Sequence, residues 1–204
     1  MNTISSMMGE QRVLPIIQAN NEDEGLNIAR AIHAAGINAV EVVLRSERAA
    51  QVITAIKQNV PEMIVSAGTV VDEASYVKAV NAGADFIITP GFSPALLDIL
   101  SGSEIPTLPG VASVAEIIVA REHGYRELKF FPAGIAGGPA FLKAVQSLFQ
   151  DTRFCPTGGV SGDNYEDYLA LNNVFAVGGT WVVKPQWVKD GQWDEITQAC
   201  KAAK

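Results

Sequence analysis

The residues Arg126-Glu127-Leu128-Lys129-Phe130-Phe131-Pro132-Ala133 form a short apolar stretch that has a lysine at its centre and runs into a glycine-rich segment. Alternate residues of a strand share a face, so Glu127, Lys129 and Phe131 point one way and Leu128 and Phe130 the other. Burial disfavours a charged amine, and a neutral amine is a nucleophile toward carbonyl carbon. The alternative is a lysine that snorkels or forms a salt bridge at a sheet edge.

Further apolar stretches of strand length lie on both sides of this one, and segments with helical features separate them. The pattern predicts seven more strands, at about 12–17, 39–44, 63–67, 85–89, 105–108, 152–156 and 174–177. Helices are expected from a cap at Asn20 or Asn21 to Gly36, over 47–59, 72–81 and 113–123, and from near Ser93, Pro139 and Ser161, with one more at the C-terminus. Strands that alternate with helices indicate a parallel sheet.

A weak internal period supports a closed arrangement of these strands. Gly36, Gly83 and Gly124 each end a helix just before a strand, and Asn173 has the same place before the last one, at spacings of 47, 41 and 49 residues. No G-x-G-x-x-G fingerprint follows the first strand. The sequence therefore favours an α/β (β/α)₈ TIM barrel over a Rossmann sheet, as a single domain over residues 1–204 with a short N-terminal leader.

Composition limits the classes of partner. The 204 residues are 48% hydrophobic and 18% charged, and their formal net charge of −7 argues against nucleic acid or an anionic membrane. No apolar run reaches the roughly 18 residues that span a bilayer, and residues 1–11 lack the layout of a signal peptide. Two cysteines, Cys155 and Cys200, are too few for a disulfide framework. We expect a cytoplasmic protein, and the net charge does not exclude an anionic small substrate, because a site can be locally positive.

Charged residues recur at the carboxyl ends of the strands, where such a barrel has its active site. Glu41, Val43 and Arg45 share one face of the second strand. If that face is the barrel interior, the carboxylate and the guanidinium can converge with Lys129. The alternative is a purely structural pair between Glu41 and Arg45.

Two glycine pairs follow the last two strands, at 157–161 (Thr-Gly-Gly-Val-Ser) and 178–180 (Gly-Gly-Thr). Loops in these positions commonly bind phosphate through backbone N–H groups, although two ordinary turns would leave the same pattern.

The remaining histidines and tryptophans do not indicate a second candidate site. His33 and His123 lie within expected helices, and no cluster has metal-ligand spacing. The tryptophans Trp181, Trp187 and Trp193 are expected to pack the C-terminal segment.

These motifs together resemble the bacterial 2-keto-3-deoxy-6-phosphogluconate (KDPG) aldolases, which also act as 4-hydroxy-2-oxoglutarate (KHG) aldolases. The resemblance is carried by 41–45 (Glu-Val-Val-Leu-Arg), 68–69 (Gly-Thr), 129–133 (Lys-Phe-Phe-Pro-Ala), 156–159 (Pro-Thr-Gly-Gly) and 178–179 (Gly-Gly), in order over nearly the whole chain. It implies a homotrimeric (β/α)₈ barrel that uses an imine and neither metal nor cofactor.

The resemblance also implies residue roles. Lys129 would form the imine, Glu41 would act as general acid and base, and Arg45 and Thr69 would hold the pyruvyl carboxylate. Other expected substrate-binding residues, several at the phosphate end, are Pro90, Phe131, Thr157, Gly158, Gly159, Gly178, Gly179 and Thr180.

This chain departs from the family pattern at two places. It has Gly134 where the family often has glutamate, and Thr180 where it often has serine. The expected reaction is cleavage of 2-dehydro-3-deoxy-6-phosphogluconate to pyruvate and glyceraldehyde 3-phosphate, and of 4-hydroxy-2-oxoglutarate to pyruvate and glyoxylate. The alternatives are an aldolase for the phosphogalactonate epimer, a metal-dependent lyase, and a catalytically silent barrel that binds phosphosugars.

Overall fold

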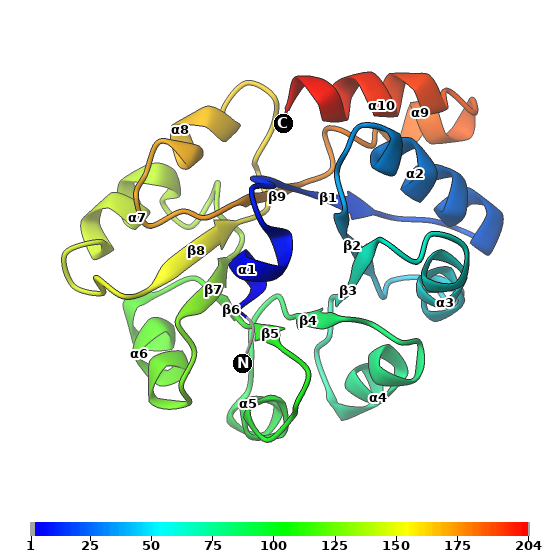
Figure 1. Ribbon diagram of the computed structural model, residues 1–204. Helices are drawn as coiled ribbons and strands as arrows, with labels where there is room; N and C mark the ends of the chain where they lie inside the picture. Colours follow the sequence, from blue (N-terminus) through cyan, green and yellow to red (C-terminus); the bar gives the residue numbers. More distant parts are fainter. Residues whose placement is uncertain (1–2, 204) are drawn as a thin grey trace.

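The computed structural model describes residues 3–203, in which helices surround a curled parallel arrangement of strands (Figure 1). The strands are β1 (Val13–Ile17), β2 (Ala39–Val43), β3 (Ile64–Gly68), β4 (Phe86–Ile88), β5 (Thr107–Leu108), β6 (Gly110–Val111), β7 (Glu127–Phe130), β8 (Arg153–Pro156) and β9 (Val177–Gly179). The helices are α1 (Ile4–Met8), α2 (Glu22–Ala34), α3 (Ala49–Asn59), α4 (Glu73–Asn81), α5 (Pro94–Ser101), α6 (Val114–Glu122), α7 (Gly138–Val145), α8 (Tyr165–Leu169), α9 (Pro185–Lys189) and α10 (Trp193–Ala202).

The strands form two parallel sheets. One has the order β5-β4-β3-β2-β1-β9, and the other has the order β6-β7-β8. The chain passes from the first sheet to the second at Pro109, because Leu108 pairs with Ile88 of β4 whereas Gly110 pairs with Lys129 of β7. Proline lacks the N–H that a continuous ladder would need. This break replaces the single strand expected at 105–108.

Capping residues explain where several helices begin. Asn21, Ser93 and Ser113 each accept a hydrogen bond from a backbone N–H in the first turn of the helix that follows. Asp72 does the same for α4 and forms a reciprocal capping box with Ser75. Such caps satisfy amide groups that the helix leaves unpaired, so these helix starts follow closely from the sequence.

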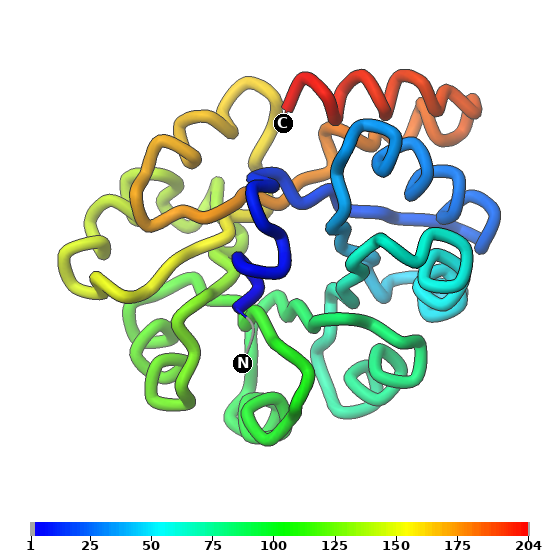
Figure 2. Tube along the Cα trace, in the orientation of Figure 1, coloured from blue at the N-terminus to red at the C-terminus, as the bar shows by residue number. Residues whose placement is uncertain are grey.

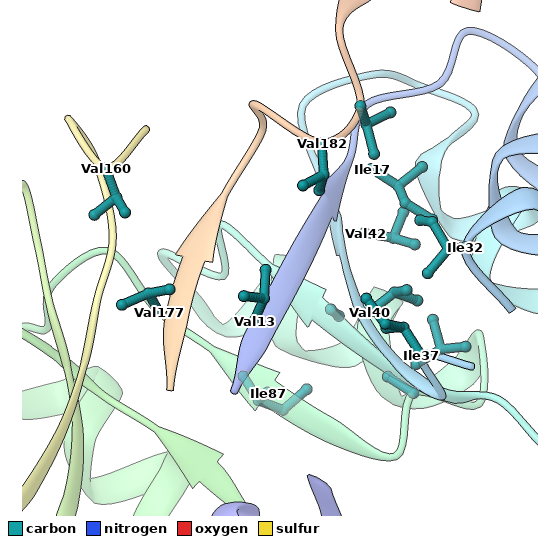
Figure 3. Close-up of a cluster of buried hydrophobic side chains, with 14 of the residues drawn as sticks. Val13, Ile17, Ile32, Ile37, Val40, Val42, Ile87, Val160, Val177 and Val182 are labelled. Carbon is teal, nitrogen blue, oxygen red and sulfur yellow. The ribbon is translucent and has the colours of Figure 1, made fainter. Parts of the chain in front are cut away.

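An outer apolar layer joins the strands to the helices that surround them. In Figure 3, Ile17 of β1, Val40 and Val42 of β2, Ile32 of α2 and the nearby Ile37 belong to this layer, and each is at most 1% exposed. Val40 and Val42 alternate with Ala39, Glu41 and Val43, which face the interior of the curled sheet. Both faces of β2 are thus buried, as expected of a parallel sheet between helices and an interior.

An inner apolar cluster fills the space at the amino ends of the strands, where α1 lies. Figure 2 traces the N-terminal segment across the middle of the ring of elements. Ile4 and Met8 of α1 are buried in a cluster with, among others, Leu14, Phe86 and Cys155. The segment expected as a leader therefore includes a helix that is part of the core.

The remaining differences from the expected elements are local. The last strand lies at 177–179 instead of 174–177, and Val174 makes only an isolated bridge to Phe154. The helix expected from near Ser161 begins at Tyr165. Within residues 3–203, no helix has both the length and the apolar character that crossing a membrane requires.

The anchor of α1 generates a testable prediction. Both carboxylate oxygens of Glu127 accept hydrogen bonds from Ser5, one from its backbone N–H at 3.0 Å and one from its hydroxyl. Glu127→Ala should lower the free energy of unfolding by about 1.5–3 kcal/mol, because hydrogen bonds to a charged acceptor are lost. Urea unfolding measures this. Glu62→Ala, at an exposed glutamate, is the control, and equal midpoints for both variants would contradict the proposed anchor.

Candidate active site

The centre of the site is a buried ion pair between two strands of different sheets. Nζ of Lys129 (β7) donates to Oε1 of Glu41 (β2) at 3.2 Å. The side chains are 7% and 1% exposed. The sequence placed Glu41 and Arg45 on one face and left open a structural pair between them. Glu41 pairs with Lys129 instead, and Arg45 lies beyond the strand end with its side chain exposed.

The position of Glu41 depends on Gly68, its neighbour on β3. A Cβ on Gly68 would collide with Oε1 of Glu41 and would lie 2.7 Å from Cγ and Cδ, so only glycine leaves room for this carboxylate. The second oxygen, Oε2, is buried and has no hydrogen-bond partner among the described residues. An unpaired buried oxygen is costly, and it leaves the carboxylate able to bind a water or a substrate hydroxyl.

A cavity of about 220 Å³ opens over this pair at the carboxyl ends of the strands. Arg45 and Thr69 contribute to its wall, and Nζ of Lys129 lies 5.3 Å from the centre of the Phe131 ring. Thr69 has a φ of 64°, and no other non-glycine residue in 3–203 has a positive φ. Such strain is common at functional sites. The lining residues that the sequence predicted are Glu41, Arg45, Thr69, Pro90, Lys129, Phe131, Thr157, Gly158, Gly159, Gly179 and Thr180.

Gly178 is the one predicted site residue that does not line this cavity. It lies behind the wall, where a Cβ would meet Oγ1 of the buried Thr157. Gly158 and Gly159 have φ values of 84° and 80°, in the region that favours glycine. No hydrogen bond within residues 3–203 uses the backbone N–H of Gly159 or Thr180, so these two donors are available to an anion.

Four lining residues were not predicted from the sequence: Ile16, Gln18, Val43 and Val160. Gln18 carried a usable signal, because it is the first polar residue after the apolar β1. A second cavity of about 560 Å³ adjoins the first and shares with it Ile16, Gln18, Val43, Arg45 and Thr180. Arg45 and Thr180 therefore border both spaces.

The cysteines and histidines of residues 3–203 do not form a second candidate site beside the pair of Lys129 and Glu41. Burial raises the pKa of the Cys155 thiol to about 12, and the nearby charge of Lys129 opposes this shift only in part, so the thiol stays protonated at neutral pH. His33 and His123 lie at the ends of α2 and α6. Within residues 3–203, no three His, Cys, Asp or Glu side chains are grouped as metal ligands.

A buried lysine beside a carboxylate, under a cavity with a free guanidinium and exposed glycine amides, has the groups required to form an imine with an anionic keto substrate. The fold and the site thus indicate a lysine-dependent enzyme with a parallel α/β architecture.

Comparison with known proteins defines the family. The model of the family described as KDPG and KHG aldolase matches residues 4–199, and the chain belongs to this family. It is a carbon–carbon lyase of the aldolase type.

The chain is 44% identical over 200 residues to a 2-dehydro-3-deoxy-phosphogluconate aldolase of Pseudomonas aeruginosa, covering 98% of this chain and 91% of that protein. It is 40% identical over 191 residues to the KHG/KDPG aldolase of Escherichia coli, covering 94% and 90%. The solved KDPG aldolase of Legionella pneumophila, captured with pyruvate as a covalent carbinolamine at low pH, is 39% identical. It superposes with a TM-score of 0.96 over 99% of this chain and 98% of that chain.

The contact between Gly68 and Glu41 generates a prediction about turnover. Gly68→Ala should displace the carboxylate from Lys129 and lower kcat on the order of a hundredfold, as expected when an acid–base group is misplaced. Glu41→Gln should lower kcat similarly. The measurement is pyruvate release under saturating substrate. Gly102→Ala, in which the new Cβ makes only ordinary contacts, is the control, and a Gly68→Ala enzyme with unchanged kcat would remove the positioning role.

Proposed function

We propose that this protein cleaves 2-dehydro-3-deoxy-6-phosphogluconate to pyruvate and glyceraldehyde 3-phosphate through an imine at Lys129. It would cleave 4-hydroxy-2-oxoglutarate to pyruvate and glyoxylate in the same way. The observation that carries the proposal is the buried contact of 3.2 Å between Lys129 and Glu41 at the base of the cavity. The relatives named above support the choice of substrates.

The first stage forms the imine. A proton moves from Nζ of Lys129 to the adjacent carboxylate, and the neutral amine attacks C2 of the keto acid. Glu41, directly or through a water bound at Oε2, protonates the C2 oxygen to give the carbinolamine. It then takes a proton from the nitrogen and passes it to the C2 hydroxyl, which leaves as water to give the protonated imine. The cavity is lined by Phe131 on one side of the amine, which limits the access of bulk water to it.

The second stage breaks the C3–C4 bond. Removal of the C4 hydroxyl proton forms the aldehyde, and the electron pair of the broken bond passes into the protonated imine to give an enamine. Glyceraldehyde 3-phosphate leaves, C3 of the enamine is protonated, and water hydrolyses the imine to pyruvate and free Lys129. Among residues 3–203, Glu41 is the one carboxylate that lines the cavity, so we assign these proton transfers to it.

Two groups of residues would orient the substrate. The exposed guanidinium of Arg45, with Thr69 near it on the wall, would bind the C1 carboxylate, for which a planar fork of donors is suited. The N–H groups of Gly159 and Thr180 would bind the phosphate, which Gly158 would border. Pro90 and Phe131 would shape the cavity. Gly178 would leave room for the side chain of Thr157, which lines it.

We further infer a single-domain closed (β/α)₈ barrel, because parallel bridges join Phe154 to Val174 and Thr157 to Gly178 between the two sheets. We propose a homotrimer, for which Val71, Val77 and Val80 around α4 offer exposed apolar surface. Sedimentation of a monomeric species alone would exclude it. A cytoplasmic location is consistent with the free thiols of Cys155 and Cys200.

The imine is tested by trapping. Borohydride with pyruvate should add one reduced pyruvyl group to Lys129, read by intact mass and peptide mapping. Lys129→Ala should show neither adduct nor turnover, while Lys143→Ala, at an exposed lysine, should show both. Circular dichroism checks that each variant is folded. A folded wild-type protein without an adduct would return Lys129 to a structural role and favour the catalytically silent phosphosugar-binding barrel.

The nearest alternative substrate is the phosphogalactonate epimer, which differs at C4. Thr180, where the family often has serine, borders the cavity at the end expected to hold the distal part of the substrate. Parallel assays with the two epimers should give the higher kcat/KM for the gluconate form, and a higher value for the other would reverse the assignment. Activity that survives a chelator would exclude the metal-dependent lyase.

A further inference from the structure

The glycine loops that border the cavity come from different parts of the chain, and one aromatic side chain lies between them. Trp181 lies two residues after the end of β9. A Cβ on Gly179 would collide with Cζ3 and Cε3 of its indole, so the six-membered ring packs directly on the Gly179 backbone. Glycine at this position is what allows the ring to approach so closely.

The opposite edge of the same indole faces the loop that follows β8. A Cβ on Gly162 would lie 3.5 Å from Cδ1, and the ring stacks on Tyr165 with centroids 5.6 Å apart and planes 29° apart. Stacking of this kind fixes two side chains relative to one another beyond the effect of buried area. Trp181 is therefore held to the start of α8.

The start of α8 is tied in turn to the glycines of the first loop. Nδ2 of Asn164 donates to the carbonyl of Gly159 at 2.9 Å, and Oδ1 accepts from the N–H of Ser161 at 2.9 Å. The N–H of Tyr165 donates to the carbonyl of Ser161 at 3.0 Å. Contacts thus run without a break from Gly159 through Asn164, Tyr165 and Trp181 to Gly179.

We infer that Trp181 is a positioning residue that sets the separation of the two glycine loops and thereby the affinity for the phosphate end of the substrate. The inference rests on the proposed function and assigns Trp181 a role beyond the packing of the C-terminal segment. Because the indole packs on the Gly179 backbone on one side and on Gly162 and the Tyr165 ring on the other, a smaller side chain would let the loops move independently. The loops then lose the preorganised array of N–H donors, while Lys129 and Glu41, on β7 and β2, keep their contact.

The test compares a phosphorylated with a non-phosphorylated substrate. Trp181→Leu should raise KM for 2-dehydro-3-deoxy-6-phosphogluconate about tenfold or more, as expected for donors misplaced by a fraction of an ångström to about one ångström. The kcat/KM for 4-hydroxy-2-oxoglutarate, which has no phosphate, should change less than about twofold. This second substrate also shows that the variant is folded and active.

Trp187→Leu is the matched control. Trp187 lines the same surface groove as Trp181, and Nζ of Lys184 lies 4.5 Å from the centre of its ring. The atoms nearest to a Cβ on Gly162 or Gly179 belong to Trp181 and not to Trp187, so this control leaves the link between the loops in place. It should leave both KM values unchanged. An unchanged KM for the phosphorylated substrate in Trp181→Leu, or an equal rise for both substrates, would overturn the inference.

Calorimetric titration with glyceraldehyde 3-phosphate separates this inference from the proposed function. If the wild-type protein releases no pyruvate from either substrate, the proposed function fails. Weaker binding by Trp181→Leu than by Trp187→Leu would still support the positioning role. Equal binding by the two variants would refute that role, whether or not the wild-type protein is an active aldolase.

Discussion

The ion pair between Lys129 and Glu41 is the constraint on which the rest of the structure depends. The two side chains come from different sheets and meet in an interior that excludes water from all but a few per cent of their surface. Two buried charges are tolerated only when each is held against the other, and loss of either partner leaves an uncompensated charge. Apolar layers inside and outside the strands provide the rigidity, and Gly68 provides the space.

Strand faces and helix starts could be predicted from the sequence, because interactions between residues close in the chain determine them. Alternation placed Glu41 and Val43 on one face of their strand, and that face lines the cavity together with Lys129. The helix starts expected at Asn20 or Asn21, near Ser93 and at about Ser113 were confirmed. The partner of Glu41 could not be derived, because 88 residues separate it from Lys129 and Arg45 is a nearer candidate. The break at Pro109 was also missed, since it depends on which sheet each side of the proline joins.

The site combines what a motif can indicate with what only packing determines. Glycine pairs predicted open loops, and eleven of the twelve predicted residues line the cavity. Gln18 and Val160 join them because neighbouring strands end at the same level, and Trp181 acts from behind the wall. Val160 and Trp181 carry no sequence signal that marks them as site residues. Their effect comes from the shape and fixed spacing of the groups they support.

The placement of α1 has a kinetic consequence. Ile4 and Met8 fill the space at the amino ends of the strands, beneath the layer that holds Lys129, and the described cavity opens at the other end. Substrate and products then share one route. In the proposed reaction, the three-carbon fragment stays covalently bound to Lys129 and would lie behind the phosphorylated fragment. In that reaction this covalent bond makes the aldehyde leave first and pyruvate second, and the short N-terminal helix adds that both must leave through the opening by which the substrate entered.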